Sequence, residues 1–347
     1  MTLRRDGNST APTRLIAGLR ETAAQETLAL ETLALPEGAL KDTTTRVLLD
    51  ATHGEPARAI GAGDLISERY QLGELLGRGA FGVVFRALDR HTSQHVALKV
   101  LSSELTSLRR RFRRGAKLAT GFRHPNLVHT RALGHDRDLD YQVMELPAAA
   151  EDLEQVLARE GRLPWEQAVS LTVDLLRGLH YMHQRSVVHR DVKPSNVLRV
   201  AAGGREIARL IDYDLTKSFQ VQETQDSGVF RLEAGPLVYS GSAGTPFYMS
   251  LARLQGAAAT PADDVYAAAL ILYQLLSGRL PTDQPRAPET LSELELARLR
   301  PPAPVPGVPL PLQRVLQRAL APHPEQRYAS AASLLTSLKV SRICFAA

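Results

Sequence analysis

The chain has 347 residues, a length that allows one large two-lobed domain plus additional segments. Its formal net charge is +5, and much of the excess lies in a basic run at 109–117 whose only aromatic residue is Phe112, so nucleic-acid binding is not expected. A single cysteine, Cys344, excludes an intrachain disulfide framework, and no apolar run is long enough for a membrane span, which together predict a soluble, cytoplasmic protein without a secretory signal.

Residues 1–66 are predicted to form an N-terminal extension that is mostly flexible, because they are rich in Thr, Ala and Gly and are interrupted by prolines. A Glu-Thr unit recurs every five residues and places threonines at Thr22, Thr27 and Thr32, a period that fits neither helix nor strand. Two interpretations stay open. The segment is a short helix followed by a linker, or its threonines are phosphorylated and bound by a phosphothreonine-reading partner.

A glycine-rich run follows a strand-like stretch at 70–76. It carries glycines at Gly77, Gly79 and Gly82, and a second strand-like stretch begins at Val83. A dinucleotide-binding turn would lead into a helix, so this arrangement instead favours a hairpin. We expect the glycine backbone of this hairpin to lie over phosphate groups, because a Cβ atom would hold the backbone away from them.

The next elements are an apolar strand at 96–100 that contains Lys99, a helix at 105–120, and a strand at 141–146. Phe112, Ala116 and Ala119 give the helix an apolar stripe, and its arginines are predicted to cover the other faces. Between Leu105 and His135 the chain has no acidic residue.

The stretch HRDVKPSN, residues 189–196, carries an acid, a lysine and an amide at fixed offsets: Asp191, Lys193 and Asn196. An acid can accept a hydroxyl proton, a lysine can neutralise a phosphoryl oxygen, and an amide oxygen can hold a hard cation. A strand at 209–215 then contains Asp212, and helices are predicted for most of the remaining chain, with a long apolar one at 260–276.

In this order, the motifs resemble those of the eukaryotic-like, bacterial-type serine/threonine protein kinases, over about residues 70–338. The resemblance implies an α+β fold with two lobes, a small antiparallel sheet with one helix and a larger helical lobe. The kinase domain would span 67–340, with the small lobe at about 67–144, the large lobe at about 145–340, and a tail at 341–347.

The resemblance also implies a site for ATP and Mg²⁺. Asp191 would be the catalytic base and Lys193 would neutralise the transferred phosphoryl group, while Asn196 and Asp212 would hold Mg²⁺. The acceptor would be a serine or threonine hydroxyl of a protein substrate. The residues expected to bind ATP are Leu76, Gly77, Arg78, Gly79, Ala80, Phe81, Gly82, Val84, Lys99, Glu145 and Leu146.

Further roles follow from the same resemblance. Asp264 would brace the backbone of the catalytic loop, and Glu151 or Asp152 would hold the ribose unless these acids simply begin a solvated helix. Arg190 would bind a phosphate on the polar segment 216–244, with Ser240 and Ser242 as the nearest acceptors.

Three positions depart from the family pattern: Gly115 replaces the helix glutamate that pairs with the strand lysine, Asp214 replaces the glycine of DFG, and Ala252 replaces the glutamate of APE, whose usual partner would be Arg327. Two acids are candidates to substitute for the missing helix acid: Glu104 and Asp214. Two functions therefore stay open. One is a kinase of low or partner-dependent activity. The alternative is a pseudokinase that binds nucleotide weakly or not at all and acts as a regulatory scaffold.

Overall fold

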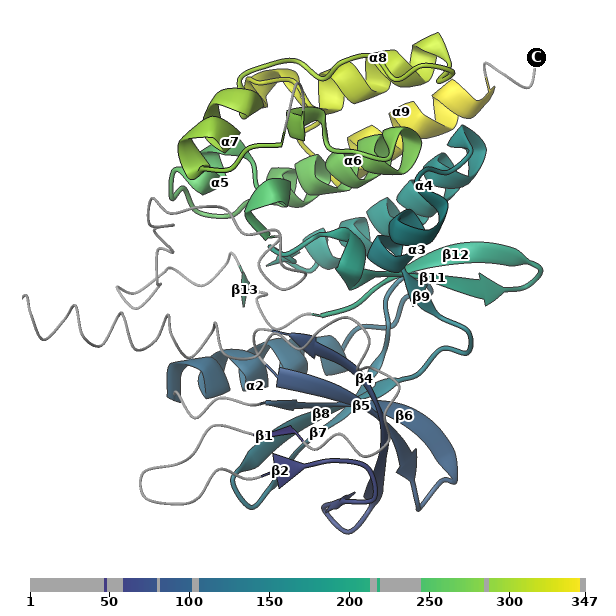
Figure 1. Cartoon of the computed structure of the whole chain (residues 1–347), viewed down its shortest axis with the longest axis vertical. Coiled ribbons are helices and arrows are strands. Elements are labelled where there is room, and N and C mark those ends of the chain that lie inside the picture. Colours follow the sequence, from purple (N-terminus) through teal and green to yellow (C-terminus); the bar gives the residue numbers. More distant parts are fainter. Residues whose placement is uncertain are drawn as a thin grey trace, which may run out of the picture.

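The structure is a computed structural model that describes residues 47–48, 59–79, 82–101, 106–212, 217–218, 245–283 and 287–343. These ranges form two lobes, a sheet with one helix below and a helical lobe above (Figure 1). The predicted α+β, two-lobed fold is confirmed. The positions Thr22, Thr27, Thr32, Ser240 and Ser242 lie outside the described residues.

An antiparallel sheet with the spatial order β3-β4-β5-β6-β8-β7 forms the small lobe. Its strands are β3 Leu65–Ile66, β4 Tyr70–Gly79, β5 Gly82–Asp89, β6 Gln94–Leu101, β7 Thr130–Asp136 and β8 Leu139–Glu145. The short strands β1 Val47–Leu48 and β2 Ala59–Ile60 pair with each other. Val47, Ile60 and Ile66 are buried in the core of this lobe. Part of the predicted N-terminal extension therefore contributes to the small-lobe core.

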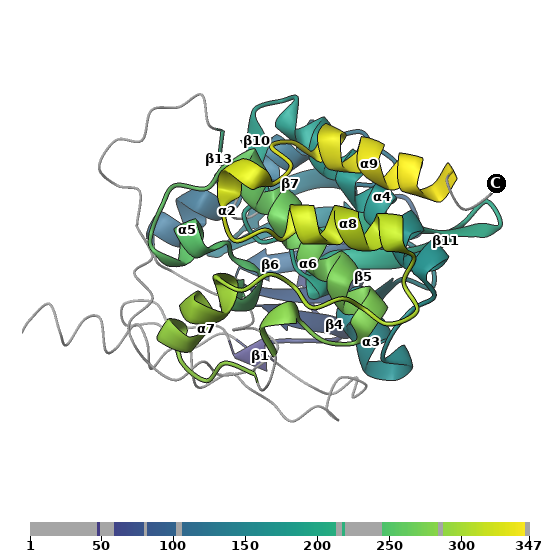
Figure 2. The same cartoon turned by 90° about the horizontal axis from the view of Figure 1, so that it is seen from above.

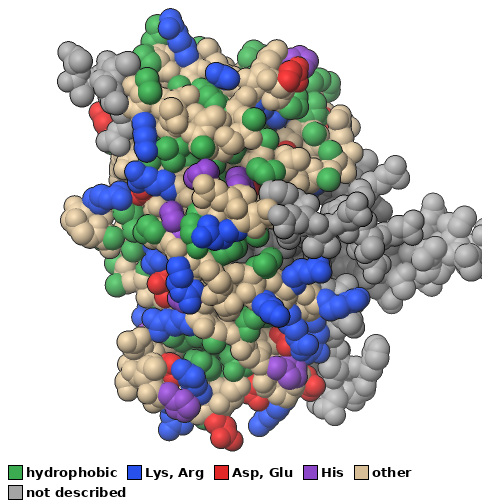
Figure 3. Space-filling model, turned by 180° about the vertical axis from the view of Figure 1, so that it is seen from behind, with side chains coloured by type: hydrophobic (Ala, Val, Ile, Leu, Met, Phe, Trp, Pro, Cys, Tyr) green, Lys and Arg blue, Asp and Glu red, His purple; other side chains and the backbone are tan. Residues whose placement is uncertain are grey.

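Helix α2, Thr106–Thr120, packs against β7 and β8 and is the helix predicted at 105–120. Phe112, Ala116 and Ala119 are buried, as their spacing predicts, and Gly115 is buried as well. Basic side chains gather on the face of the small lobe beside this helix (Figure 3).

The helices of the large lobe are α3 Leu153–Glu160, α4 Trp165–His183, α5 Leu251–Leu254, α6 Pro261–Ser277, α7 Leu291–Arg298, α8 Leu310–Ala319 and α9 Ala331–Ile343. Its short strands are β9 Glu151–Asp152, β10 Val187–Val188, β11 Val197–Ala202, β12 Arg205–Leu210 and β13 Lys217–Ser218.

Helix α6 is the centre of the large lobe and packs against α4, α8 and α9 (Figure 2). Thr260 and Asp263 form a capping box at its start, and Gly278 ends it with a left-handed backbone, φ 77°. Its apolar residues are buried on nearly all sides, which explains the long apolar run in the sequence. In the part of the chain that the structure describes, no helix is both long and apolar enough to cross a bilayer.

Candidate active site

A buried carboxylate on α6 fixes the catalytic loop. Asp264 accepts hydrogen bonds from the backbone N–H groups of His189 and Arg190, each at 2.8 Å, and its Oδ2 lies 2.8 Å from His183 Nε2. Arg190 has a φ of 76°, a conformation that residues other than glycine seldom adopt. Asp264 thus makes the bracing contact expected of it, and it holds the loop in an unusual conformation directly before Asp191.

The loop brings its three polar side chains together. Lys193 Nζ lies 3.0 Å from Asp191 Oδ2, and Asn196 Nδ2 donates to the same oxygen at 3.0 Å and to the Asp191 carbonyl at 2.8 Å. Asp191 is 9 % exposed, so the group is nearly buried. Because the Asn196 amide nitrogen makes these two bonds, the amide oxygen is the atom that remains to accept a hydrogen bond or to bind a cation.

Lys99 and Asp212 connect the two lobes across this site. The Lys99 ammonium lies 2.7 Å from Asp212 Oδ1, and the Lys99 side chain is 6 % exposed. Gly115 offers no acid, and the two substitutes considered for it, Glu104 and Asp214, lie outside the described residues. Among the described residues, Lys99 thus pairs with the acid expected to bind metal.

Ile211 ties Asp212 to the catalytic loop. Its N–H donates to the Asn196 carbonyl at 2.9 Å, and its own carbonyl lies 2.9 Å from His189 Nε2. The two pairs, Lys99 with Asp212 and Asp191 with Asn196, are thus parts of one hydrogen-bonded region and do not belong to separate sites.

A small apolar cluster lies where the lobes meet. Ala97, Val128 and Met144 are its buried members, and the partly buried side chains packed against them are Leu76, Val84, Leu146, Leu198 and Ile211. Leu76, Val84 and Leu146 were predicted to contact a nucleotide. Ala97, Leu198 and Ile211 were not, although their positions two residues before Lys99, two after Asn196 and one before Asp212 were a signal that could have identified them.

The glycine-rich run forms the predicted hairpin between β4 and β5, with Gly79 opposite Gly82 and Gly77 opposite Val84. Ala80 and Phe81 lie outside the described residues. A Cβ atom at Gly82 would lie 2.2 Å from the Val100 carbonyl oxygen, whereas one at Gly77 would meet nothing within 4 Å. Close strand packing thus requires glycine at Gly82, while Gly77 leaves open space.

Glu145 is more engaged by the protein than the prediction assumed. Its N–H donates to the His129 carbonyl at 3.0 Å, and its carboxylate accepts from the His129 N–H at 2.8 Å and from Arg209. The backbone N–H of Glu145 is therefore already hydrogen-bonded. A nucleotide ring bound here would have to form its hydrogen bonds with other backbone groups of this segment.

Of the two acids considered for ribose binding, Asp152 is the N-cap of α3. It accepts from the Gln155 N–H at 2.9 Å, while Glu151 binds Arg159 and Arg199. Burial raises the pKa of Asp152. Burial likewise raises the pKa of Glu154, and the charge of Asp152 adds to this effect. The structure thus shows the helix-start alternative for Asp152.

Helix α2 is anchored by its arginines. Arg109 and Arg113 both donate to the buried carboxylate of Asp140, each through Nε at 3.0 Å, and His135 Nδ1 also lies 3.0 Å from it. These arginines were predicted only to cover outer faces of the helix. The contact was missed because Asp140 is distant in sequence and lies on β8.

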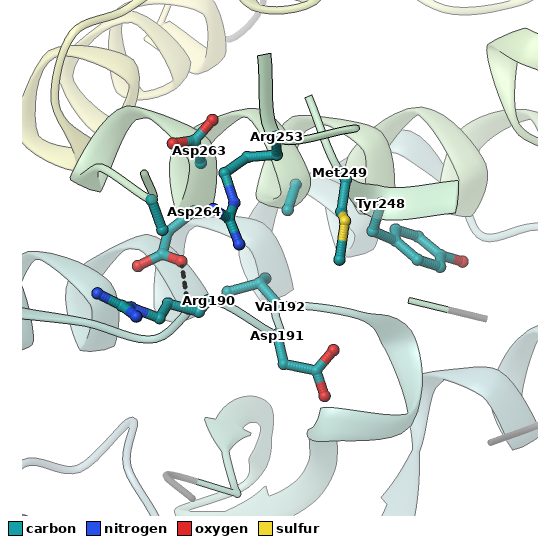
Figure 4. A pocket seen from close by; sticks show the side chains of 10 residues that line it. Arg190, Asp191, Val192, Tyr248, Met249, Arg253, Asp263 and Asp264 are labelled. Atoms are coloured by element: carbon teal, nitrogen blue, oxygen red, sulfur yellow. Dashed lines mark hydrogen bonds between the residues drawn. The ribbon is translucent and has the colours of Figure 1, made fainter. Parts of the chain in front are cut away.

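A pocket beside Asp191 is lined by the catalytic loop, α6 and the segment before α5 (Figure 4). Tyr248 and Met249 line this pocket, and Arg253 reaches into it from α5. The Asp191 carboxylate points away from Asp264 and α6.

Comparisons with known proteins agree with this geometry. A family model described as "Protein kinase domain" matches residues 70–337. The serine/threonine-protein kinase PkaA of Streptomyces coelicolor is 34% identical over 291 residues, which cover 79% of this chain and 50% of that protein. PknB of Mycobacterium leprae is 30% identical, with 79% and 43% covered, and PrkC of Bacillus subtilis is 28% identical, with 80% and 41% covered. The matched region therefore spans half or less of the length of these relatives.

Proposed function

The chain belongs to the protein kinase family, and on this premise we propose that it transfers the γ-phosphoryl group of ATP to serine or threonine hydroxyls of protein substrates. The observation that carries the proposal is the meeting of Lys99, Asp191, Asn196 and Asp212 within one hydrogen-bonded region. Residues 67–340 are proposed as the catalytic domain.

The residues present fit Mg²⁺. The Asn196 oxygen and the Asp212 carboxylate are hard oxygen ligands, and Mg²⁺ is usually held by one or two such groups together with substrate phosphates. Among the described residues, no group of three or more His, Cys, Asp or Glu side chains is placed to hold a metal ion. When bound, the ion would neutralise negative charge on the phosphates.

The chain's own residues would perform the transfer. Asp191 would accept the proton of the attacking hydroxyl as the new oxygen–phosphorus bond forms and the β–γ bridging bond of ATP breaks, releasing ADP. Lys193, already 3.0 Å from Asp191, would neutralise oxygen charge on the moving phosphoryl group. The glycine hairpin and Lys99 would position the phosphates, and the apolar cluster around Met144 would hold the ring.

The scaffold alternative has less support. A protein that has no chemistry to perform does not need an acid, a lysine and an amide within hydrogen-bond distance of one another. Here an aspartate of α6 also holds the backbone directly before the acid. The missing glutamate at Gly115 concerns how Lys99 is oriented and leaves the reacting groups intact.

Phosphoryl transfer from radiolabelled ATP to a dephosphorylated protein mixture tests the proposal. Replacing the proposed base, Asp191→Asn, should lower incorporation by about 10²–10⁴-fold, the usual contribution of a general base. Asp138→Asn, an exposed site on the far end of the sheet, should retain the wild-type rate. Equal labelling by the wild-type and Asp191→Asn proteins would contradict the proposal and favour the scaffold.

A further inference from the structure

Two arginines lie close together in the large lobe without an acidic partner. Arg298, at the end of α7, is 3 % exposed, and its guanidinium lies 5.5 Å from the centre of the Tyr266 ring. Arg327 lies over the same ring at 4.3 Å. Neither arginine forms an ion pair with an acid in the described ranges of the chain. A buried positive charge without a counter-charge is costly, so this pair requires an explanation.

Arg327 has replaced its expected acid with backbone carbonyls. The glutamate expected from the family pattern is Ala252, and Arg327 instead donates to the carbonyls of Ala321, at 2.5 Å, and Pro322, at 2.7 Å. Burial lowers the pKa of Arg327, and the positive charge of Arg298 lowers it further. The hydrogen bonds of Arg327 are thus met, and the negative charges of Asp263 and Glu325 act on it without forming an ion pair.

Arg298 has unused donors and lines a cavity. Its Nη2 donates to the Phe247 carbonyl, whereas Nε and Nη1 are buried and have no partner among the described residues. The hydroxyl of Thr282, a residue that is 4 % exposed, is also buried without a partner there. Both side chains line one small pocket, together with Tyr266, Arg300 and Leu320. The lining residues come from α6, from the 3₁₀ turn Pro281–Asp283, from the end of α7 and from the residue that follows α8.

We propose that this pocket binds a monatomic anion, with chloride as the natural ligand, between the guanidinium of Arg298 and the hydroxyl of Thr282. The free groups are N–H donors and a hydroxyl that can donate, which is the arrangement an anion requires. The cavity volume is about 10 Å³, room for a single water-sized particle and too small for phosphate or a carboxylic acid. A water molecule would satisfy the donors but would add no negative charge beside Arg298.

The anion would support the substrate side of the molecule. Arg298 holds the carbonyl of Phe247, and the next two residues, Tyr248 and Met249, line the pocket beside Asp191. The bound ion would fix the guanidinium that holds this segment. The ion thereby supplies the negative charge that a glutamate at position 252 would have supplied.

Thermal unfolding of the full chain tests the site without any reference to phosphoryl transfer. Sodium chloride and sodium gluconate are compared at equal ionic strength, because gluconate is too large for the cavity. We expect the melting temperature to rise with chloride and to saturate, with little change in gluconate. Thr282→Val should raise the half-saturating chloride concentration by about tenfold, the equivalent of one hydrogen bond to a charged group. Thr336→Val, a matched change at an exposed hydroxyl, should not alter it.

Two further measurements decide the outcome. Ala252→Glu returns a carboxylate to this region and should flatten the chloride response. In crystals grown with bromide, an anomalous peak should lie between Arg298 and Thr282. Equal melting curves of the wild-type protein in chloride and gluconate, or a peak without anomalous signal at that position, would overturn the proposal.

Discussion

At the scale of single residues, Asp140 shows how much of this protein depends on contacts between distant positions. Its side chain is 2 % exposed, and it binds Arg109 and Arg113 of α2. Burial alone would raise the pKa of Asp140, but the hydrogen bonds from Arg113 and Arg109 outweigh burial and lower it. This one carboxylate therefore joins the basic helix to the sheet.

The first prediction concerns this anchor. Asp140→Asn should lower the free energy of unfolding by about 1–3 kcal/mol at pH 7, because the hydrogen bonds lose their charged acceptor. The folded-state pKa lies below the unfolded one, so the stabilisation is present above about pH 4 and is lost as the pH falls through the folded-state pKa. Urea unfolding of both proteins at pH 7 and pH 3.5 measures the change, and Asp138→Asn is the control. A difference that stays constant with pH would contradict the explanation.

The second prediction concerns Gly115. An acid here is expected to compete for Lys99 and so leave Asp212 to the metal. Gly115→Glu should therefore raise the rate of phosphoryl transfer by about 10- to 100-fold, the scale of one preorganised electrostatic contact. Gly115→Gln has the same size without the charge and is the matched control. If both variants react at the same rate in the radiolabel assay, Lys99 does not depend on an acid from α2.

Residue roles were predictable from the sequence where they follow from local spacing. The offsets among Asp191, Lys193 and Asn196 predicted a group whose side chains do contact one another. The partners of Asp140, and the cavity shared by Arg298 and Thr282, arise only when segments far apart in the chain pack together. No spacing rule reports such contacts.

At the scale of elements, the β4–β5 hairpin gives a sharp test of why glycine occupies particular positions. Gly82→Ala should lower the free energy of unfolding by about 1–3 kcal/mol, because its Cβ would lie 2.2 Å from the Val100 carbonyl oxygen and the strands must move apart. Gly77→Ala meets nothing within 4 Å and should leave stability within about 0.5 kcal/mol. Chemical unfolding of the two variants measures this contrast, and equal losses would show that packing at Gly82 is not the cause.

Elements in which apolar residues recur at a regular spacing were predicted well, whereas strands of only two residues were not. The apolar spacing of α2 and the cap and apolar run of α6 place these helices within a residue of their observed bounds. Strands β1 and β2 have only two residues each, so neither shows a measurable alternation. They form because a partner strand and a core are available.

At the scale of the whole molecule, the small-lobe core extends across the boundary that composition suggests. Ile60→Ala should cost about 2–5 kcal/mol, the usual loss for a buried isoleucine, because Ile60 is 1 % exposed. Leu65→Ala, close by and 37 % exposed, should cost much less. Urea unfolding followed by tryptophan fluorescence and by circular dichroism measures both variants. Equal small losses would mean that residues before 67 do not belong to the cooperative core.

The bond between Lys99 and Asp212 has a consequence for motion. One partner belongs to the sheet and the other to the helical lobe, so this 2.7 Å ion pair holds the two lobes together. A ligand that binds the Lys99 ammonium breaks this ion pair. Rotation of the lobes relative to each other is then thermodynamically linked to ligand binding. Without such a ligand, the wild-type protein is expected to resist rotation of its lobes more than the Lys99→Met variant does.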